Sequence, residues 1–245
     1  MRLGGLQKLS LIDYPGKLAA VVFTQGCNFR CGYCHNPELV IPQEYCPAVP
    51  EEEVMAFLRS RQEYLEGVVV TGGEPTVQEG LISFLDQLKR LGYLVKLDTN
   101  GSRPEVLKQV LSLRLVNYVA MDVKASLIRY DGVTNVPVST EKIKESIRLI
   151  LDAGIPHEFR TTVVKTFHSA GDLLEIRSLV EGARQYTLQR ARIDGKILDK
   201  SLLAREQYSD AEFERLKEIV SGAMDLPEDS GEAILDTAPA TRSRG

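Results

Sequence analysis

The sequence of 245 residues lacks any long hydrophobic run. Because no stretch of about 18 consecutive apolar residues is present, a transmembrane helix of ordinary length is excluded. Residues 1–15 also lack the unbroken apolar core of a secretory signal peptide, since Asp13 and other polar residues interrupt them. We therefore expect a cytoplasmic protein.

An excess of positive charge is also missing. Thirty Lys and Arg residues face 34 Asp and Glu residues, which gives a net charge of −4. A mildly acidic chain is a poor candidate for unspecific binding to nucleic acid, and nothing in it points to a membrane surface. The 43% hydrophobic content is ordinary for a globular protein with a sizeable core.

Cysteine is scarce, and its distribution is informative. All four cysteines lie in the first fifth of the chain, at Cys27, Cys31, Cys34 and Cys46. Disulfides that staple a small secreted protein tie distant segments together, which three thiols within eight residues cannot do. The cysteines therefore indicate a metal or redox site.

Hydrophobic periodicity predicts six strand–helix units. The strands are short apolar runs of the kind found in sheets buried on both faces. They are expected at 18–24, 67–71, 94–98, 118–123, 157–164 and 186–193. The helices are expected at 50–65, 77–91, 104–113, 140–153, 171–183 and 209–224, the last one with Ser209 as its cap.

This alternation predicts an α/β fold with a parallel sheet and right-handed crossovers. Six units, rather than eight, favour an open or partial barrel. Polar residues and glycines recur at the carboxyl ends of the strands, where parallel α/β proteins place their sites. We expect one domain at 1–224 and a loose tail at 225–245, because residues 227–245 are polar and have no periodicity.

The first three cysteines have the spacing C-x3-C-x2-C. Closely spaced thiolates on one loop favour an iron–sulfur cluster, and three of them fill only three corners of a [4Fe–4S] cluster. The fourth iron is then open to a substrate or cofactor. A structural zinc site completed by His35 or Cys46 is an alternative. A thioredoxin-like pair fits poorly, because a third cysteine lies four residues upstream.

The triplet follows the first predicted strand and has the aromatic Tyr33 directly before Cys34. Gly72-Gly73-Glu74-Pro75 follows at the end of the second strand. In this combination the sequence resembles the radical S-adenosylmethionine (SAM) superfamily. The resemblance implies a [4Fe–4S] cluster whose fourth iron is chelated by SAM, and a partial (β/α)6 barrel, in agreement with the six units.

Further segments resemble the activases of glycyl-radical enzymes. These are Cys34-His35-Asn36-Pro37, Leu97-Asp98-Thr99-Asn100-Gly101, Met121-Asp122-Val123-Lys124 and Asp13-Tyr14-Pro15-Gly16. Tyr14 departs from the pattern of the formate-lyase activases and is similar to the branch associated with anaerobic ribonucleoside-triphosphate reductase. The resemblance extends over about residues 3–200.

The resemblance also implies roles for individual residues. Cys27, Cys31 and Cys34 would ligate the cluster, whereas Cys46 is too isolated to build a second one. Contacts to SAM would come from Tyr33 against the adenine, from Gly72, Gly73 and Glu74 at the methionine group, from Asp98, Lys124 and Arg160, and from Gln189 near the ribose or adenine. Asp98, Thr99 and Asp122 would form a monovalent-cation site near SAM. The plainer interpretation of Asp98 and Asp122 is that they cap turns at strand ends.

The implied activity is radical formation. Flavodoxin or ferredoxin would reduce the cluster, SAM would be cleaved to methionine and a 5′-deoxyadenosyl radical, and that radical would take a hydrogen atom from a glycine of a partner enzyme. The expected partner is anaerobic ribonucleoside-triphosphate reductase. The alternatives are another radical SAM enzyme, such as a deazaguanine synthase or a peptide maturase, and a zinc-stabilised binding module without catalysis.

Overall fold

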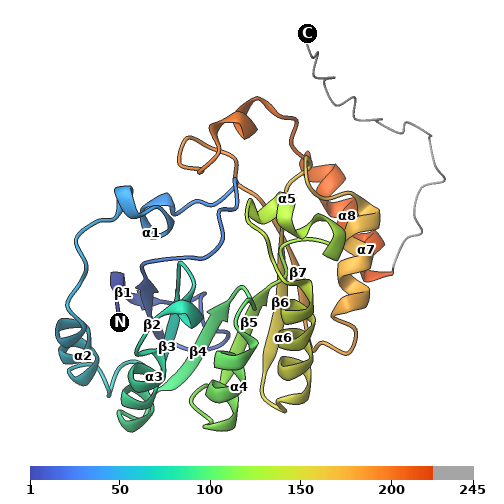
Figure 1. Cartoon of the computed structure of the whole chain (residues 1–245). Coiled ribbons are helices and arrows are strands. Elements are labelled where there is room, and N and C mark those ends of the chain that lie inside the picture. Colours follow the sequence, from blue (N-terminus) through green and yellow to red (C-terminus); the bar gives the residue numbers. More distant parts are fainter. Residues whose placement is uncertain (223–245) are drawn as a thin grey trace, which may run out of the picture.

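A seven-stranded sheet forms the centre of the part of the chain that the computed structural model describes, residues 1–222 (Figure 1). The strands follow one another across the sheet in chain order, from β1 to β7. β1 is antiparallel to β2, and all later neighbours pair in parallel. Their bounds are β1 Leu3–Ser10, β2 Ala19–Thr24, β3 Gly67–Gly72, β4 Leu94–Thr99, β5 Tyr118–Asp122, β6 His157–Val163 and β7 Tyr186–Arg190.

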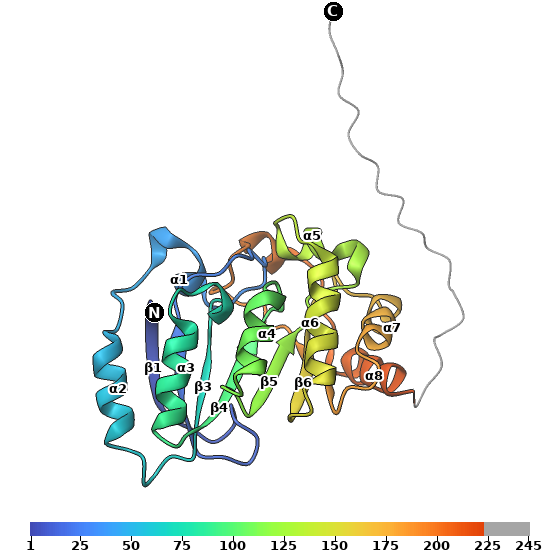
Figure 2. The same ribbon diagram turned by 60° about the horizontal axis from the view of Figure 1, so that its bottom comes forward.

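Helices separate the parallel strands and lie side by side along one face of the sheet (Figure 2). The α-helices are α1 Pro37–Val40, α2 Glu51–Arg59, α3 Leu81–Arg90, α4 Pro104–Ser112, α5 Tyr130–Thr134, α6 Thr140–Asp152, α7 Ala170–Leu179 and α8 Asp210–Ser221. Short 3-10 turns are η1 Pro42–Glu44, η2 Pro75–Val77, η3 Leu127–Arg129 and η4 Lys200–Ala204. Sequential strand order with helices on one face is the arrangement of an open, partial barrel, which confirms the expected fold.

The strands β2, β3 and β5 are largely apolar because both of their faces are covered, whereas β4, β6 and β7 carry polar residues as well. Val68 and Val70 of β3 belong to the main core, which packs the sheet against the helices. Val69 points to the other face, where it packs with Tyr14, Tyr118 and small side chains. The ring of Tyr14 meets that of Tyr118 edge-on, with 6.0 Å between ring centroids. The loop that follows β1 thus covers the inner side of the sheet.

Two differences from the expected elements matter for the site. β1 was not predicted, and it adds an antiparallel edge strand beside β2. The sixth expected strand, 186–193, ends at Arg190, after which the chain turns away from the sheet toward the cysteines. The expected tail at 225–245 lies outside the described residues. None of the helices within residues 1–222 has the length and apolar character needed to cross a lipid bilayer.

Candidate active site at the carboxyl ends of the strands

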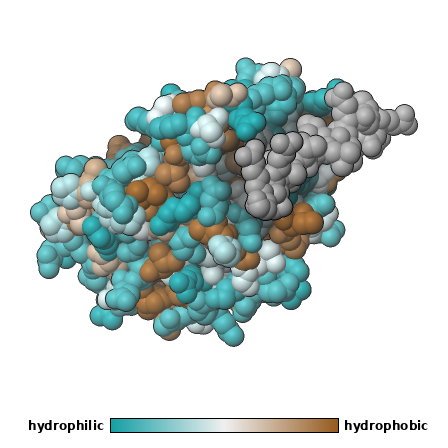
Figure 3. All heavy atoms as spheres, turned by 45° about the horizontal axis from the view of Figure 1, so that its top comes forward, coloured by the Kyte–Doolittle hydropathy of each residue, from teal (hydrophilic) through white to brown (hydrophobic). Residues whose placement is uncertain are grey.

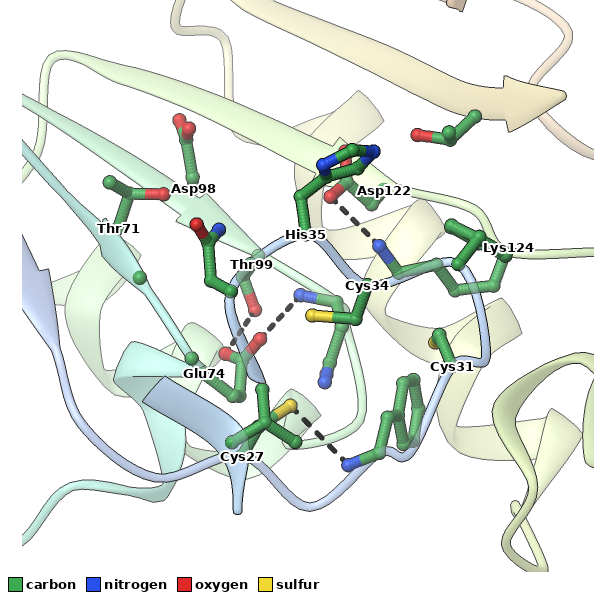
Figure 4. Close-up of a pocket in the computed structure, with 18 residues that line it drawn as sticks. Cys27, Cys31, Cys34, His35, Thr71, Glu74, Asp98, Thr99, Asp122 and Lys124 are labelled. Atoms are coloured by element: carbon green, nitrogen blue, oxygen red, sulfur yellow. Dashed lines mark hydrogen bonds and ion pairs between the residues drawn. The ribbon is translucent and has the colours of Figure 1, made fainter. Parts of the chain in front are cut away.

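A pocket opens at the carboxyl ends of strands β2 to β6 (Figure 4). Hydrophilic residues make up most of the surface in Figure 3, which turns this end of the molecule toward the viewer. The pocket is lined by Cys27, Phe29, Cys31, Tyr33, Cys34, His35, Asn36, Val40, Thr71, Gly72, Gly73, Glu74, Asp98, Thr99, Asn100, Asp122, Lys124 and Thr162. The structure therefore brings together residues from five separate segments, including most of the expected site.

The cysteine loop, residues 25–36, follows β2 and is tied to its surroundings through both backbone and side-chain hydrogen bonds. The amide of Gly26 donates to the carbonyl of Leu39 over 2.7 Å, and that of Arg30 donates to Thr134 over 2.8 Å. The carbonyls of Gly32 and Cys34 accept from the segment that follows β7. These backbone bonds do not involve the thiols, and all three thiols of the loop line the pocket, whereas Cys46 is exposed and lies outside it.

Burial decides the protonation state of the three thiols. It raises the pKa of Cys27 to about 12 and that of Cys31 to about 11, and it raises the pKa of Cys34 as well. The ammonium of Lys124 opposes this effect at all three thiols. Because thiolates are the metal-binding form, iron has to displace protons from these cysteines when it binds.

Glu74 joins the ends of two strands rather than facing the pocket as a free carboxylate. Glu74 is only 1% exposed, and its carboxylate accepts hydrogen bonds from Thr76, from the Thr99 hydroxyl at 2.7 Å and from the backbone amide of Asn100 at 2.6 Å. Burial raises its pKa, and these donors oppose that rise. With its oxygens taken by Thr76, Thr99 and Asn100, Glu74 is suited to fix the pocket wall.

The two glycines before Glu74 are required by a close approach within the protein. Gly72 has φ +114°, and a Cβ there would lie 2.4 Å from the backbone nitrogen of Thr24. At Gly73 a Cβ would lie 2.1 Å from the carbonyl oxygen of Gly26. A larger residue at position 72 would push β3 away from the end of β2, and one at position 73 would push it away from the cysteine loop. The sequence suggested glycine for contact with a ligand, whereas the contact seen here is with the loop itself.

A polar network that the sequence did not suggest anchors the cysteine loop to β4. Asn28, the residue after Cys27, donates to the Ser102 hydroxyl at 2.9 Å and accepts from the Asn100 amide group at 3.1 Å. Asn100 in turn accepts from the backbone amide of Ser102. The asparagine in the segment Asp98-Thr99-Asn100-Gly101 was the available signal, but its partner lies 72 residues away.

Arg160 lies between Asp98 and Asp122. Its guanidinium contacts Asp122 at 2.9 Å and Asp98 at 3.3 Å, while Lys124 contacts Asp122 at 3.0 Å and Lys96 contacts Asp98 at 2.8 Å. Burial raises the pKa of Asp122, but Arg160 and Lys124 outweigh that effect and hold it well below its ordinary value. Burial also lowers the pKa of Lys124, yet Asp122 keeps it well above its usual range.

This arrangement differs from the expected cation site. The carboxylates of Asp98 and Asp122 are paired with basic side chains, and the Thr99 hydroxyl donates to Glu74 instead of joining them. Within residues 1–222, no group of three or more His, Cys, Asp or Glu side chains is arranged to hold a single metal ion. Arg160 does not line the pocket, so the structure gives it the role of positioning Asp98 and Asp122.

Of the two remaining residues expected to contact SAM, Tyr33 lies at the pocket and Gln189 does not. Tyr33 lines the pocket, and its hydroxyl is buried without a hydrogen-bond partner among the described residues. Gln189 is exposed near the end of β7 and does not line the pocket. Its neighbour across the β6–β7 pair, Thr162, does. Thr162 was missed because nothing in its local sequence distinguishes it from other strand residues.

These residues fit an iron–sulfur cluster with a further ligand. Three free thiols line a single pocket, and the buried hydroxyl of Tyr33 in the same pocket lacks a partner. A cube-shaped cluster offers separate iron corners, so its thiolates do not have to meet at one point. The fourth ligand of a zinc site is not provided, because Cys46 lies outside the pocket and the His35 Nε2 faces the carbonyl of Arg192.

Comparison with known proteins agrees with this assignment. The model of the radical SAM superfamily matches residues 21–180. A protein of Methanocaldococcus jannaschii named "Putative glycyl-radical enzyme activating enzyme" is 34% identical over 194 residues, which cover 76% of this chain and 78% of that protein. The pyruvate formate-lyase-activating enzyme of Clostridium pasteurianum is 36% identical over 104 residues, 41% of this chain and 43% of that enzyme.

Two solved structures share the fold. SuiB of Streptococcus suis bound to S-adenosylmethionine has a TM-score of 0.64 at 18% identity, over 83% of this chain and 46% of SuiB. Coproporphyrinogen III oxidase of Escherichia coli has a TM-score of 0.57 at 15% identity, over 86% of this chain and 53% of that enzyme. This chain thus spans about half the length of either one. On the extent of the family match and the identity to the archaeal relative, the chain belongs to the radical SAM superfamily, whose cofactors are a [4Fe–4S] cluster and S-adenosylmethionine.

Proposed function

We propose that this protein is an activating enzyme that generates a glycyl radical on a partner enzyme. The observation that carries the proposal is the similarity to the archaeal activating enzyme, which extends over 76% of this chain at 34% identity. It is supported by the pocket, where Cys27, Cys31 and Cys34 meet residues from the ends of four further strands. We place this activity in the cytoplasm.

The residues of the pocket have distinct tasks in this activity. When bound, the cluster and SAM supply a one-electron cleavage of SAM that yields a hydrogen-abstracting radical. Cys27, Cys31 and Cys34 hold the cluster, and the glycines before Glu74 keep β3 close to the cysteine loop. Phe29 and Val40 provide apolar walls that limit the access of water.

Lys124 and Asp122 place a partly buried ion pair in the lining of the same pocket as the cysteines. In the proposed activity this pair orients the charged methionine group of SAM. Tyr33 lines the same pocket, and in the proposed activity its ring lies against the adenine of SAM, to which its unpartnered hydroxyl can donate. Gln189 stays a candidate for the ribose or adenine, which requires that β7 approach the pocket more closely than it does here.

The partner that we propose is anaerobic ribonucleoside-triphosphate reductase, with flavodoxin or ferredoxin as the electron donor. The support comes from the sequence, where Asp13-Tyr14-Pro15-Gly16 resembles the branch of activases associated with that reductase. In the structure Tyr14 is buried against the inner side of the sheet, so a tyrosine at this position has a packing role as well.

The experiment is anaerobic reconstitution with iron and sulfide, followed by reduction and addition of SAM. We expect methionine and 5′-deoxyadenosine as products, and a glycyl doublet in the EPR spectrum once the reductase is added. The test variant is Cys34→Ser, and its matched control is Cys46→Ser. Only Cys34→Ser should abolish the cluster absorbance and SAM cleavage.

Three other results would contradict the proposal. SAM cleavage without a glycyl radical on any glycyl-radical enzyme would favour a radical SAM enzyme that acts on a small molecule or peptide. A protein that binds about one zinc and no iron would favour a binding module, since structural zinc takes four ligands without redox chemistry. Formation of the glycyl radical by Cys34→Ser would show that a cluster held by all three cysteines is not needed for the reaction.

A further inference from the structure

The segment between β7 and α8 lies directly on the cysteine loop. We call residues 190–205 the basic segment. Its backbone amides at Leu198 and Asp199 donate to the carbonyls of Cys34 and Gly32, over 3.1 and 2.8 Å. Figure 1 shows the segment in orange across the end of the molecule where the strands finish. It therefore forms the outer cover of the loop that carries the cluster ligands.

The basic segment is anchored by buried apolar side chains and leaves little space beneath it. Ile197 is fully buried, and Leu202 is nearly so. A Cβ on Gly32 would lie 3.0 Å from the Cβ of Asp199, which shows how closely the two segments approach. His35 adds a contact between its ring nitrogen Nε2 and the carbonyl of Arg192. The backbone of the basic segment is consequently in direct contact with the backbone of the cysteine loop.

None of residues 190–205 lines the pocket. The basic segment contacts the cysteine loop at Gly32, Cys34 and His35 without lining the pocket. A protein that rests on the basic segment can therefore approach the cluster while the pocket stays open to SAM and to the glycine of the partner enzyme. This separation is what a two-partner reaction requires.

The charge of the segment is opposite to that of the whole chain. Residues 190–205, which start at the last residue of β7, contain five Lys or Arg and two Asp residues, a net charge of +3, in a chain whose net charge is −4. The whole link between β7 and α8, residues 191–209, has a net charge of +1, because it leaves out the last residue of β7 and includes Glu206, which pairs with Lys165. Lys196, Lys200 and Arg205 are exposed and form no ion pair within residues 1–222. Leu203, in the same segment, is an exposed apolar side chain with 49% of its surface accessible.

We propose that the basic segment is the docking surface for a small acidic one-electron carrier protein, and this inference rests on the proposed function. An apolar contact surrounded by complementary charges is typical of weak encounters, in which electrostatic steering raises the association rate. The carrier loses one electron and the cluster gains it, and no proton or heavy atom is transferred. The glycine-bearing partner has to reach the pocket itself, which favours the carrier as the occupant of this surface.

The test is a charge reversal with Lys196→Glu, Lys200→Glu and Arg205→Glu in the reconstituted enzyme. Binding of oxidised flavodoxin is measured by isothermal titration calorimetry at several salt concentrations. SAM cleavage is measured against the concentration of reduced flavodoxin. Because each exposed charge pair contributes modestly, we expect the Kd and the KM for flavodoxin to rise about tenfold and their salt dependence to weaken, with little change in kcat.

Two controls separate this inference from the proposed function. Photoreduced deazariboflavin, a small reductant that needs no docking surface, should support equal SAM cleavage by wild type and variant. If wild type fails in this assay, the proposed function fails, and calorimetry still decides about the surface. The matched variant Lys108→Glu, Lys142→Glu and Arg148→Glu places three reversals on α4 and α6, on the outer side of the sheet, and should leave the Kd unchanged.

An unchanged Kd in the first variant, or an equal rise in the matched variant, would overturn the docking surface. So would a variant that binds flavodoxin normally and instead loses affinity for the glycyl-radical enzyme. If the reversal disturbs the folding of the cysteine loop, the neutral variant Lys196→Gln, Lys200→Gln and Arg205→Gln applies the same test with a smaller expected rise, of about threefold.

Discussion

Glu74 illustrates how a single buried side chain can decide the geometry of the site. Its carboxylate accepts hydrogen bonds from Thr76 beside it and from Thr99 and Asn100 at the end of β4. The next residue in that network, Asn28, belongs to the cysteine loop. Through these contacts the ends of β2, β3 and β4 are held in one arrangement, and the position of Cys27 depends on all of them.

Glu74→Gln should lower the free energy of unfolding by about 1–3 kcal/mol, because one carboxylate oxygen becomes an amide that cannot accept from a buried donor. Chemical denaturation of the metal-free protein measures this change. Glu79→Gln is the matched control, since Glu79 lies five residues away and is exposed. Equal stability of Glu74→Gln and the wild type would show that the network does not hold the strand ends together.

A second prediction for a single residue concerns Arg160. Removal of its side chain in Arg160→Ala leaves the carboxylates of Asp98 and Asp122 with only Lys96 and Lys124 as partners. Breaking a largely buried pair from one side is costly, and since Arg160 and Asp122 keep 15% and 28% of their side chains exposed, we expect a loss of about 2 kcal/mol in the free energy of unfolding. Thermal or chemical unfolding measures it.

The control for Arg160 is Arg103→Ala, which breaks an exposed pair with Glu105 at 3.5 Å. An exposed pair contributes about 1 kcal/mol or less. A loss in Arg160→Ala no larger than that of Arg103→Ala would mean that Arg160 does not hold the two aspartates. In that case contact with SAM, as the sequence suggested, would again be the better explanation of Arg160.

Residue-scale inference from the sequence succeeded where the chemistry is local. The three cysteines lie within eight residues, and their spacing alone indicated one site; all three line the pocket. Arg160 is the opposite case, because its partners lie 38 and 62 residues away and the spacing in the chain carries no information about them.

At the scale of elements, the close contact between the end of β3 and the cysteine loop allows only glycine at position 73. Gly73→Ala would bring a Cβ to 2.1 Å from the carbonyl oxygen of Gly26, and both of these atoms belong to the backbone. One of the two segments must therefore shift. We expect a variant that folds with a lower melting temperature and takes up much less iron during reconstitution, as measured by iron and sulfide analysis.

The control for this variant is Gly132→Ala in α5, where a Cβ meets nothing within 4 Å. Alanine in a helix is at least as favourable as glycine, so iron uptake and stability should be kept or slightly improved. Normal iron uptake by Gly73→Ala would show that the approach of β3 to the loop is not needed for the cluster.

The elements that the sequence predicted correctly are those with a strong local pattern. Strands β2, β3 and β5 are nearly continuous apolar runs, and β6 shows alternating burial. Helix α8 is capped by Ser209 in a capping box with Glu212, as expected. β1 was missed because it contains Gly4 and Gly5 and because six of its eight residues are partly buried or exposed. Its pairing with β2 is a long-range contact that a local pattern does not show.

At the scale of the whole molecule, the pocket collects residues that lie as far apart as Cys27 and Thr162. The order of the strands follows from the alternation of strands and helices, so the sequence predicted which segments meet at this end of the sheet. The course of the basic segment could not be predicted in this way, because it is irregular and its position depends on hydrogen bonds with Gly32 and Cys34.

Since five segments meet in the pocket, a ligand that fills it should stabilise the entire domain. A ligand that binds only the folded protein adds RT ln(1 + [L]/Kd), about 2.7 kcal/mol at a hundredfold excess over Kd. For a domain of this size we expect SAM to raise the melting temperature of the reconstituted protein by about 5–10 °C.

Removal of the cluster with a chelator should abolish most of that rise, because the iron left open by three cysteines is the main anchor of SAM. Cys34→Ser, which lacks one of the three cluster ligands, should show as little response to SAM as the chelated wild type. An equal shift with and without iron would mean that SAM is held by the protein alone, and the three-cysteine site would then lose its role as the anchor of SAM.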